Sequence, residues 1–542
     1  MIIDLNNLQN NEDLKCDICI VGSGAAGTIL FDKLSKSKFD VVLLESGLKY
    51  LNYDHEKLNE AQILLQGKRR ENAKVDIDNY RLRGLGGTTN HWGGECIKFY
   101  EIDFLKRNWV NHSGWPINLN DLNPYYKKAN SYVEIATNIF DGRVWEQIGL
   151  KSNPLNLNPN KVETHFRHRS GFRKKSSFKA INFKKYLFDT KNKNNKNKII
   201  YNATLTKLVS KNNNHIDYGI IKSLNGAEKK IISKKFILCA GGFEVARILL
   251  NSGNGKGLGN DNDLVGRFFL GHLSSHDLMK LICDTKEIAS KVAWNYSWFY
   301  VGKNASRSHI TFEKNFQEKN SLLNTGIRFL GDEDPEHPIY KAMRIRKNII
   351  NRNFENINLS TEEFLFILNN MEKVLINWKR GVLDPRGVER PMSKNMKIFY
   401  IAEQEPNKNN RIYLSNEKDI LGMNKMILDS HSSEKDKENV KKVSKHLASV
   451  FGEAKVGKIV VNENLEEKFD LFEFDNICTH PAGTTRMSAS KEDGVVDKYL
   501  RSHFVDNLYI CSSSTFPTIG CEPPTYTISA LAIRLSEHLI AN

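Results

Sequence analysis

The sequence lacks several features that would fix the class of protein at once. It has no uninterrupted apolar run long enough to cross a bilayer, and its polar N-terminus carries no apolar stretch typical of a signal peptide. It also shows no internal repeat, which argues against solenoids and propellers. These absences predict a cytoplasmic protein whose association with membranes is peripheral at most.

Cysteine is scarce, and its spacing does not indicate disulfides or a metal site. There are 8 cysteines in 542 residues. Cys16 and Cys19 lie in an apolar run, where thiols behave as small hydrophobic side chains of a strand. His272 and His276 are four residues apart but lie among glycine and serine, so we interpret them as ordinary polar residues and expect no metal.

Lysine is abundant, and the formal net charge is +16. Much of this charge is mixed with asparagine and is typical of a solvated surface, although attraction to an anionic membrane, an acidic substrate or a partner protein is an alternative. The basic residues are scattered without a reading module, so nucleic-acid binding is not expected. A chain of 542 residues with 40% hydrophobic residues predicts two or more folded domains.

The clearest motif is a glycine-rich turn between an apolar strand at 17–21 and a helical pattern that begins at Ala25. Its sequence, GSGAAG, offers free N–H groups at a helix N-terminus to a pyrophosphate, and the glycines allow close approach. An acidic residue follows about twenty residues on, placed to bind a ribose. The expected dinucleotide contacts are Gly22, Ser23, Gly24, Ala25, Gly27 and Glu45.

Two features favour FAD over a nicotinamide cofactor. The dinucleotide motif opens the chain, and a second strand–glycine–helix junction, ILCAGGFEVARILL, returns far downstream with Ala240 and Gly241 at its turn. A nicotinamide-linked dehydrogenase is the competing enzyme class, but no Tyr–Lys pair or separate catalytic lysine supports it.

The sequence resembles the glucose–methanol–choline (GMC) oxidoreductases, which are FAD enzymes that oxidise alcohols. The resemblance is nearest to the branch of pyranose oxidase and of sugar-acid and polyol dehydrogenases. It rests on motifs in family order: VGSGAAG, RGLGGTTNHWGG, GWPINLNDLNPYY, ILCAGGFEVARILLNS, NDLVGRFFLGH, NNRIYLS, HPAGTTRM and the C-terminal NLYICSSSTFPTIG segment. The middle, 293–396, carries almost none of the family pattern, and there we expect the substrate to be chosen.

The resemblance implies a mechanism. His480 matches the catalytic histidine that accepts the hydroxyl proton while hydride passes to flavin N5. The family's second His or Asn is replaced by Pro523, whose side chain cannot hydrogen-bond. Glu522, Thr525 or Tyr526 are possible substitutes, and a carboxylate at Glu522 would favour an amino-bearing substrate. The alternative is a flavin-binding scaffold or partner with altered or lost activity.

The resemblance also assigns cofactor contacts in two further segments. His91 falls where the pyranose-oxidase branch attaches flavin covalently, so the flavin is held either by a covalent bond or by a hydrogen bond there. The remaining expected contacts are Gly86, Gly87, Thr88, Asn90, Ser512, Ser513 and Thr525. We therefore expect an FAD-dependent dehydrogenase or oxidase of a small alcohol, sugar or polyol, with an unidentified electron acceptor.

The fold class expected is α/β (α+β overall), a Rossmann-like FAD-binding domain with an inserted substrate-binding domain of antiparallel sheet and helices. The FAD-binding domain is predicted to comprise 1–110, 200–292 and 466–542. The substrate-binding domain and cap segments are predicted at 111–199 and 293–465.

Overall fold

The computed structural model describes most of the chain. The described residues are 1–8, 13–65, 68–69, 81–172, 180–188, 196–253, 255–296, 298–333, 345, 348–349, 360–369, 371, 392–463 and 480–542. Within these residues, no helix combines the length and apolarity needed to cross a membrane.

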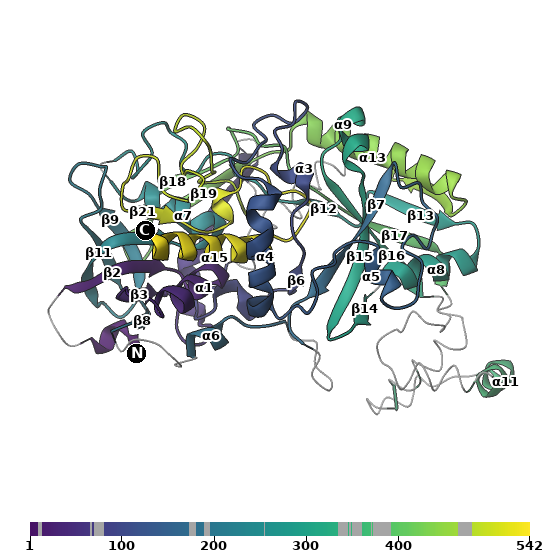
Figure 1. The fold of residues 1–542 in the computed structure, drawn as a ribbon, viewed down its shortest axis with the longest axis horizontal. Helices are drawn as coiled ribbons and strands as arrows, with labels where there is room; N and C mark the ends of the chain where they lie inside the picture. Colours follow the sequence, from purple (N-terminus) through teal and green to yellow (C-terminus); the bar gives the residue numbers. More distant parts are fainter. Residues whose placement is uncertain are drawn as a thin grey trace.

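One half of the molecule is built on a mainly parallel sheet (Figure 1). Its strand order is β1-β8-β3-β2-β11-β10-β9, with β21 also paired to β11. Only β9 and β10 run antiparallel to their neighbours. The strands are β1 (Ile2–Asp4), β8 (Lys198–Tyr201), β3 (Val41–Leu44), β2 (Leu14–Val21), β11 (Glu228–Leu238), β10 (Tyr218–Lys222), β9 (Thr204–Val209) and β21 (Leu508–Ile510).

Helices from distant parts of the chain cover this sheet. The C-terminal helix packs against both α1 and α4, as Figure 1 shows. Because β2, α1 and β3 form a parallel βαβ unit, the predicted strand–turn–helix motif is confirmed, and Cys16 and Cys19 lie on β2. The helices are α1 (Ala25–Leu34), α4 (Leu119–Val133), α6 (Lys184–Phe188), α7 (Gly241–Leu250) and α15 (Thr525–Ala541).

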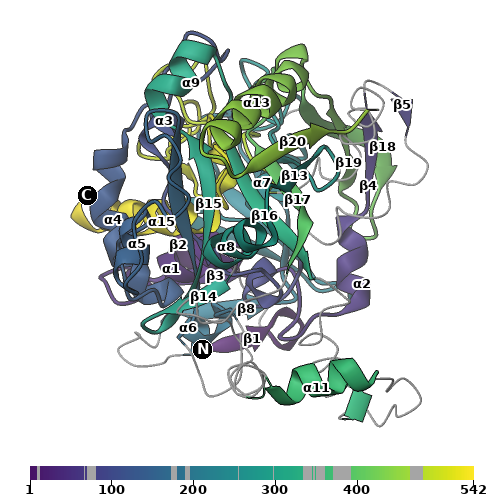
Figure 2. The same cartoon turned by 90° about the vertical axis from the view of Figure 1, so that its right-hand side faces the viewer.

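The other half is built on an antiparallel sheet, which α8 and α13 cover in Figure 2. Its order is β20-β13-β17-β16-β15-β7-β6, with β12 paired to β17 and β14 to β15. The strands are β20 (Gly457–Val461), β13 (Met279–Cys283), β17 (Met392–Ala402), β16 (Thr325–Glu333), β15 (Asn304–Phe312), β7 (Val162–Arg169), β6 (Glu95–Cys96), β12 (Leu273–Ser275) and β14 (Trp298–Val301). Its helices are α8 (Lys286–Tyr296), α9 (Lys314–Asn320) and α13 (Glu434–Glu453).

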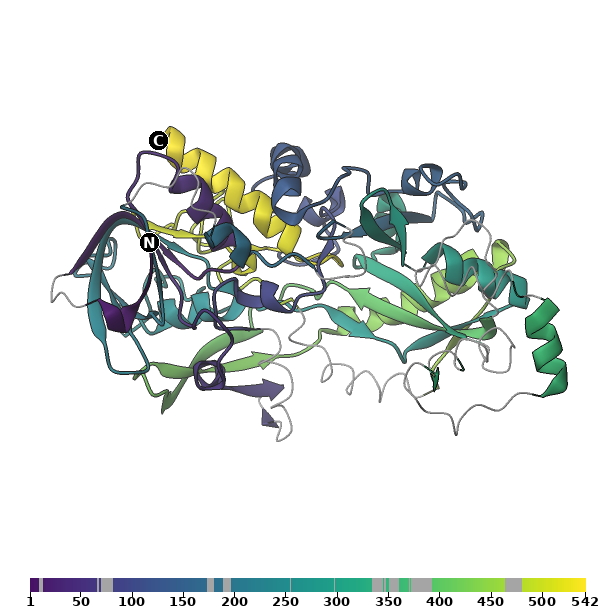
Figure 3. The ribbon, with the colours of Figure 1, turned by 90° about the horizontal axis from the view of Figure 1, so that it is seen from below.

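A smaller sheet lies below the first half in the view of Figure 3. It contains β18 (Arg411–Lys418), β19 (Asn424–Ser430), β4 (Ala61–Leu65) and β5 (Lys68–Arg69). The sequence HEKLNEAQILLQGK at 55–68 predicts a helix, but this prediction is wrong beyond residue 59. Its apolar residues pair with β19 as a parallel strand instead, and only α2 (Tyr53–Glu56) with a following 3-10 turn is helical.

Two separate hydrophobic cores support the two halves. Strands β12 and β13 belong to the antiparallel sheet, although the sequence assigned 200–292 to the FAD-binding domain. Strands β18 and β19 pack on the first core, although the sequence assigned 293–465 to the substrate-binding domain. The sequence predicts two long helices, near 336–353 and 360–380. The structure describes α11 (Thr361–Asn369) in the second, and most of the rest lies outside the described residues. The remaining short helices are α3 (Glu101–Phe104) and α5 (Arg143–Glu146).

Candidate active site

A cavity of about 580 Å³ runs from the glycine turn of α1 to His480. Both halves of the molecule contribute to its wall. The lining includes Gly22, Ser23, Gly24, Ala25, Glu45, Gly87, Thr88, His91, Ala240, Gly241, Ser512, Ser513 and Thr525, all expected from the sequence. The cavity therefore joins a dinucleotide-type turn to a partly buried imidazole.

The glycine turn is shaped to admit a phosphate. Gly24 is the N-cap of α1 without a side-chain cap, and a Cβ built there meets nothing within 4 Å. A Cβ at Gly27 would instead lie 1.8 Å from the carbonyl oxygen of Gly22, so Gly27 serves the close packing of helix on strand. The free N–H groups of the helix and the open space at Gly24 fit a pyrophosphate.

Glu45 holds the turn together more than the sequence suggested. One carboxylate oxygen accepts hydrogen bonds from the backbone and the hydroxyl of Ser23, and the other from the backbone of Gly47 and Gly84. Four bonds occupy the acceptor sites of a carboxylate. A ribose hydroxyl must therefore displace one of these donors, of which the Ser23 hydroxyl is the one able to rotate away.

Buried ion pairs brace the same end of the cavity. Glu244 on α7 pairs with Arg81 at 2.7 Å and with Arg83 at 2.9 Å. Burial alone would raise the pKa of Glu244, but Arg83, Arg247 and Arg81 lower it to about 2. The carboxylate thus stays ionised and fixes two arginines at the cavity wall.

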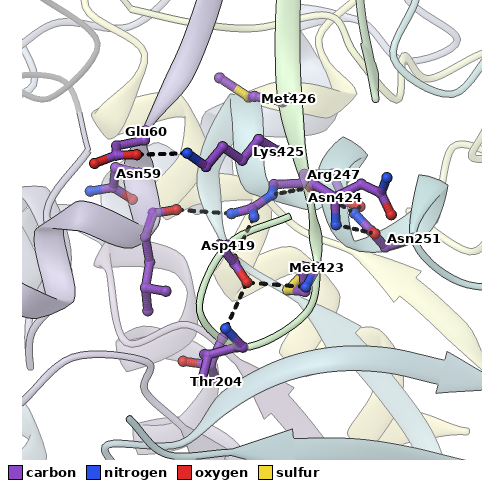
Figure 4. Close-up of polar contacts among 12 residues, drawn as sticks. Asn59, Glu60, Thr204, Arg247, Asn251, Asp419, Met423, Asn424, Lys425 and Met426 are labelled. Carbon is purple, nitrogen blue, oxygen red and sulfur yellow. Dashed lines mark hydrogen bonds and ion pairs between the residues drawn. The ribbon is translucent and has the colours of Figure 1, made fainter. Parts of the chain in front are cut away.

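Arg247, one turn further along α7, ties this helix to the small sheet (Figure 4). Its guanidinium donates to the Leu58 and Asn424 carbonyls and pairs with Asp419 at 2.6 Å. Both side chains are almost fully buried, and Asp419 also accepts from the backbone of Met423. The contacts anchor the turn between β18 and β19 behind the nucleotide end of the cavity.

The segment 86–92 lies along the cavity with unequal roles for its residues. The amide of Asn90 donates to the Leu85 and Gly87 carbonyls and accepts from Asn182, so it holds the loop and is not among the lining residues. His91 is exposed and lines the cavity, and its ring hydrogen-bonds to none of the described residues. Gly86, at φ 95°, turns the chain behind this lining.

The opposite wall comes from two strand ends. Gly241, at φ 74°, begins α7 after β11, and a Cβ there would meet nothing within 4 Å. The Ser512 and Ser513 hydroxyls lie at the end of β21 and donate to the Gly241 and Pro481 carbonyls. These serines position neighbouring loops, while their lining position also suits contact with a cofactor.

His480 lies at the far end of the cavity in a strained conformation. Its φ of 58° is rare for a residue with a side chain and is typical of functional sites. Burial, and then the charge of Arg167, lower the pKa of His480 to about 4. The imidazole is therefore neutral at pH 7 and able to accept a proton.

A second histidine contacts His480, and the sequence did not reveal it. The Nδ1 atoms of His272 and His480 lie 2.8 Å apart, and Nε2 of His272 lies 2.9 Å from the Gly520 carbonyl oxygen. The interpretation of His272 as an ordinary polar residue, which rests on the glycine and serines around it, does not foresee this contact. The antiparallel bridge between Leu270 and Ala482, whose backbones exchange two hydrogen bonds, places residue 272 opposite residue 480.

The candidate substitutes for the family's second residue lie in different places. Pro523 and Thr525 line the cavity, whereas the Tyr526 hydroxyl donates to Tyr126 and Asn130 behind it. Glu522 is fully buried and is held by Tyr100, by His309 at 2.6 Å and by Arg167 at 2.7 Å. Burial would raise the pKa of Glu522, but Arg167 and His309 lower it well below its usual value.

The βαβ turn, the cavity and the neutral, partly buried imidazole at its end are together typical of a nucleotide-dependent oxidoreductase. Models of the GMC oxidoreductase family match residues 17–274 and 406–532. The chain belongs to the GMC oxidoreductase family. It is accordingly an FAD-binding flavoprotein enzyme that acts on CH–OH groups, which confirms the resemblance seen in the sequence.

Similar proteins span nearly the whole chain. The fructose dehydrogenase large subunit of Gluconobacter japonicus is 22% identical, over 98% of this chain and 99% of that protein. The 2-methyl-1,2-propanediol dehydrogenase of Mycolicibacterium austroafricanum is 20% identical, over 96% and 95%. The crystal structure of pyridoxine 4-oxidase from Mesorbium loti has a TM-score of 0.57 at 14% identity, covers 97% and 99%, and supports the expected fold class.

Proposed function

We propose that this protein oxidises an alcohol group of a sugar, sugar derivative or polyol, and that His480 accepts the hydroxyl proton. The observation that carries the proposal is the neutral, partly buried imidazole of His480 at the end of the cofactor cavity. FAD, when bound, supplies the hydride acceptor at flavin N5. The names of the relatives, which act on fructose and on a diol, support this substrate class.

The contacts of His272 assign the proton positions on both rings. The Gly520 carbonyl can only accept, so Nε2 of His272 carries a proton and its Nδ1 is an acceptor. His480 must then donate from Nδ1, which leaves its Nε2 without a proton. No described residue hydrogen-bonds to this Nε2, so it is available as the general base.

This pairing also weighs against the scaffold alternative. That alternative rested on Pro523, which leaves the usual position of the second side chain without a hydrogen-bonding group. Here His272 contacts His480 from a different strand and orients it. We propose that His272 takes over the positioning part of the missing residue's role.

The proposal gives the loop at 86–92 the role of holding the cofactor. The free imidazole of His91 on the cavity wall suits either a covalent flavin bond or a hydrogen bond. Acid precipitation distinguishes the two, because only a covalently attached flavin stays with the denatured protein.

The test of the proposed function is anaerobic flavin bleaching with a panel of sugars and polyols. We expect His480→Ala to lower the rate of flavin reduction at least about 100-fold, since general bases contribute about 10²–10⁴-fold. Flavin content and the visible spectrum of the variant are measured alongside and should match wild type. Near-wild-type reduction by a cofactor-loaded His480→Ala variant would refute the role of His480.

A further inference from the structure

Arg328 places a cation at the substrate end of the cavity. It lies on β16 opposite Phe399 of β17, and its guanidinium carbon is 4.1 Å from the centre of that ring. The side chain is only 13% exposed, and it lines the cavity together with His480. Arginine stacked on an aromatic ring keeps its donors pointed outward from the ring edge.

This guanidinium has donors to spare. Its contact with a carboxylate is a long one, 3.6 Å from Nη1 to Glu95, and its buried Nε has no hydrogen-bond partner among the residues that the structure describes. Glu95 is already engaged by Arg167 at 3.0 Å and by Arg307. Burial lowers the pKa of Arg328 well below its ordinary value, against the opposing effect of Glu95.

The surrounding charges leave the site positive. Three guanidinium groups, of Arg167, Arg307 and Arg328, face two carboxylates, of Glu95 and Glu522. Burial is the main cause that lowers the pKa values of His309 and His480 to about 4, so both rings are neutral at pH 7. One positive charge is therefore unbalanced, and buried charges are normally paired.

We infer that the alcohol this enzyme oxidises carries a carboxylate, which binds to Arg328 while its hydroxyl group faces His480. The inference rests on the proposed function and names its substrate class. A single carboxylate balances the one free charge, and its two oxygens match the planar donors of arginine. The amino-bearing substrate suggested by Glu522 is not favoured, because Arg167, His309 and Tyr100 already occupy that carboxylate.

The test compares matched donors on the FAD-loaded protein under anaerobic conditions. The pairs are glycerate with glycerol, glucuronate with glucose, and galactonate with galactitol. A shift of the flavin absorption band reports binding, and bleaching reports oxidation. We expect at least one acid to bind about 100-fold more tightly than its neutral partner, and Arg328→Gln to remove that preference while Arg328→Lys keeps part of it.

The control variant is Lys397→Gln, which removes an equal charge from an exposed position on the same strand as Phe399. It should change every affinity less than about threefold. Any one of three results would overturn the carboxylate assignment. These are equal binding within all three pairs, equal weakening of acids and neutral partners in Arg328→Gln, and tighter binding of glycerol 3-phosphate than of glycerate. Flavin bleaching by neutral donors alone would also overturn the carboxylate assignment, but it would keep the proposed function. Tight binding of an acid without bleaching would support the Arg328 site and count against alcohol oxidation.

Discussion

At the scale of single residues, the chemistry of the site depends on which atoms of two imidazoles carry protons. On the proposed function, His272 donates from Nε2 to the Gly520 carbonyl, and its contact with His480 sets the tautomer of that ring. The sequence singled out His480, which lines the cavity, but assigned no role to His272. Sequence spacing cannot report a contact between residues 208 positions apart.

We predict that His272→Leu lowers kcat about 10- to 100-fold while KM and flavin content stay near wild type. Without an acceptor for its Nδ1 proton, His480 is free to adopt the tautomer that protonates Nε2, which cannot act as a base. His272→Gln should restore most of the rate, since its amide can accept from His480 and donate to Gly520. Steady-state kinetics across pH 5 to 8 make the comparison.

The matched control is His276→Gln, because this half-exposed ring packs against Phe399 and does not contact His480. It should leave kcat within about twofold. If His272→Leu and His272→Gln lose activity equally, the ring of His272 serves packing and not proton placement.

At the scale of elements, the glycine turn of α1 separates two roles that its sequence presents as one motif. Gly27 allows the helix to pack on β2, whereas Gly24 leaves space open on the cavity side. Both were predicted as cofactor contacts, but Gly27 is not among the lining residues. The βαβ unit could be predicted from the sequence because periodicity and glycine spacing are local. Which glycine faces the cavity and which faces the strand depends on the tertiary packing around β11.

We predict that alanine at these two glycines affects different properties, the stability of the apoprotein at Gly27 and the affinity for FAD at Gly24. Gly27→Ala forces a methyl group against the Gly22 carbonyl and should destabilise the apoprotein by at least about 3 kcal/mol, the upper range for overpacking. Gly24→Ala, at φ −63°, should leave the stability of the apoprotein within about 1 kcal/mol of wild type but raise the Kd for FAD at least about tenfold. Chemical denaturation of apoprotein and FAD titration measure the two effects.

Equal loss of apoprotein stability in both variants would contradict this division of roles. Unchanged FAD affinity in Gly24→Ala would show that the phosphates bind elsewhere.

At the scale of the whole molecule, the His480 end of the cavity lies where the two halves meet, and histidines there and in the antiparallel sheet are shielded from solvent and neutral. Burial lowers the pKa values of His480 and His168 to about 4 and that of His272 well below 6.5. In the unfolded chain these rings titrate near 6.5. Between these values the unfolded state binds more protons than the folded state.

We therefore predict that the free energy of unfolding is largest near pH 7 and falls as the pH drops from 6.5 towards 4. Each of these histidines contributes a slope of about 1.4 kcal/mol per pH unit within that window. Urea denaturation at pH 7, 6 and 5 measures the slope. In His168→Gln the slope should decrease by the share of one histidine, and a flat profile in wild type would contradict the prediction.

The general plan of the molecule could be read from the sequence, but the positive end of the site could not. The family motifs indicated a dinucleotide fold with an inserted antiparallel sheet, and that fold class is confirmed. The sequence HFRHRSGFRKK at 165–175 is typical of a basic, solvated loop, yet Arg167 is 2% exposed on β7. Its burial results from pairing with β15 across a separation of more than a hundred residues.

Arg328 and Phe399 lie between the two segments that the family models match, whereas His480, His272 and the glycine turn lie within them. One wall of the cavity thus comes from segments that the family models match, and the wall with Arg328 and Phe399 comes from a segment that they do not match. We expect substitutions at Arg328 or Phe399 to change which donor is bound while the contact between His272 and His480 is left intact. On the proposed function, donor specificity and proton transfer would thus be encoded in separate segments of the chain, so that one can change without the other.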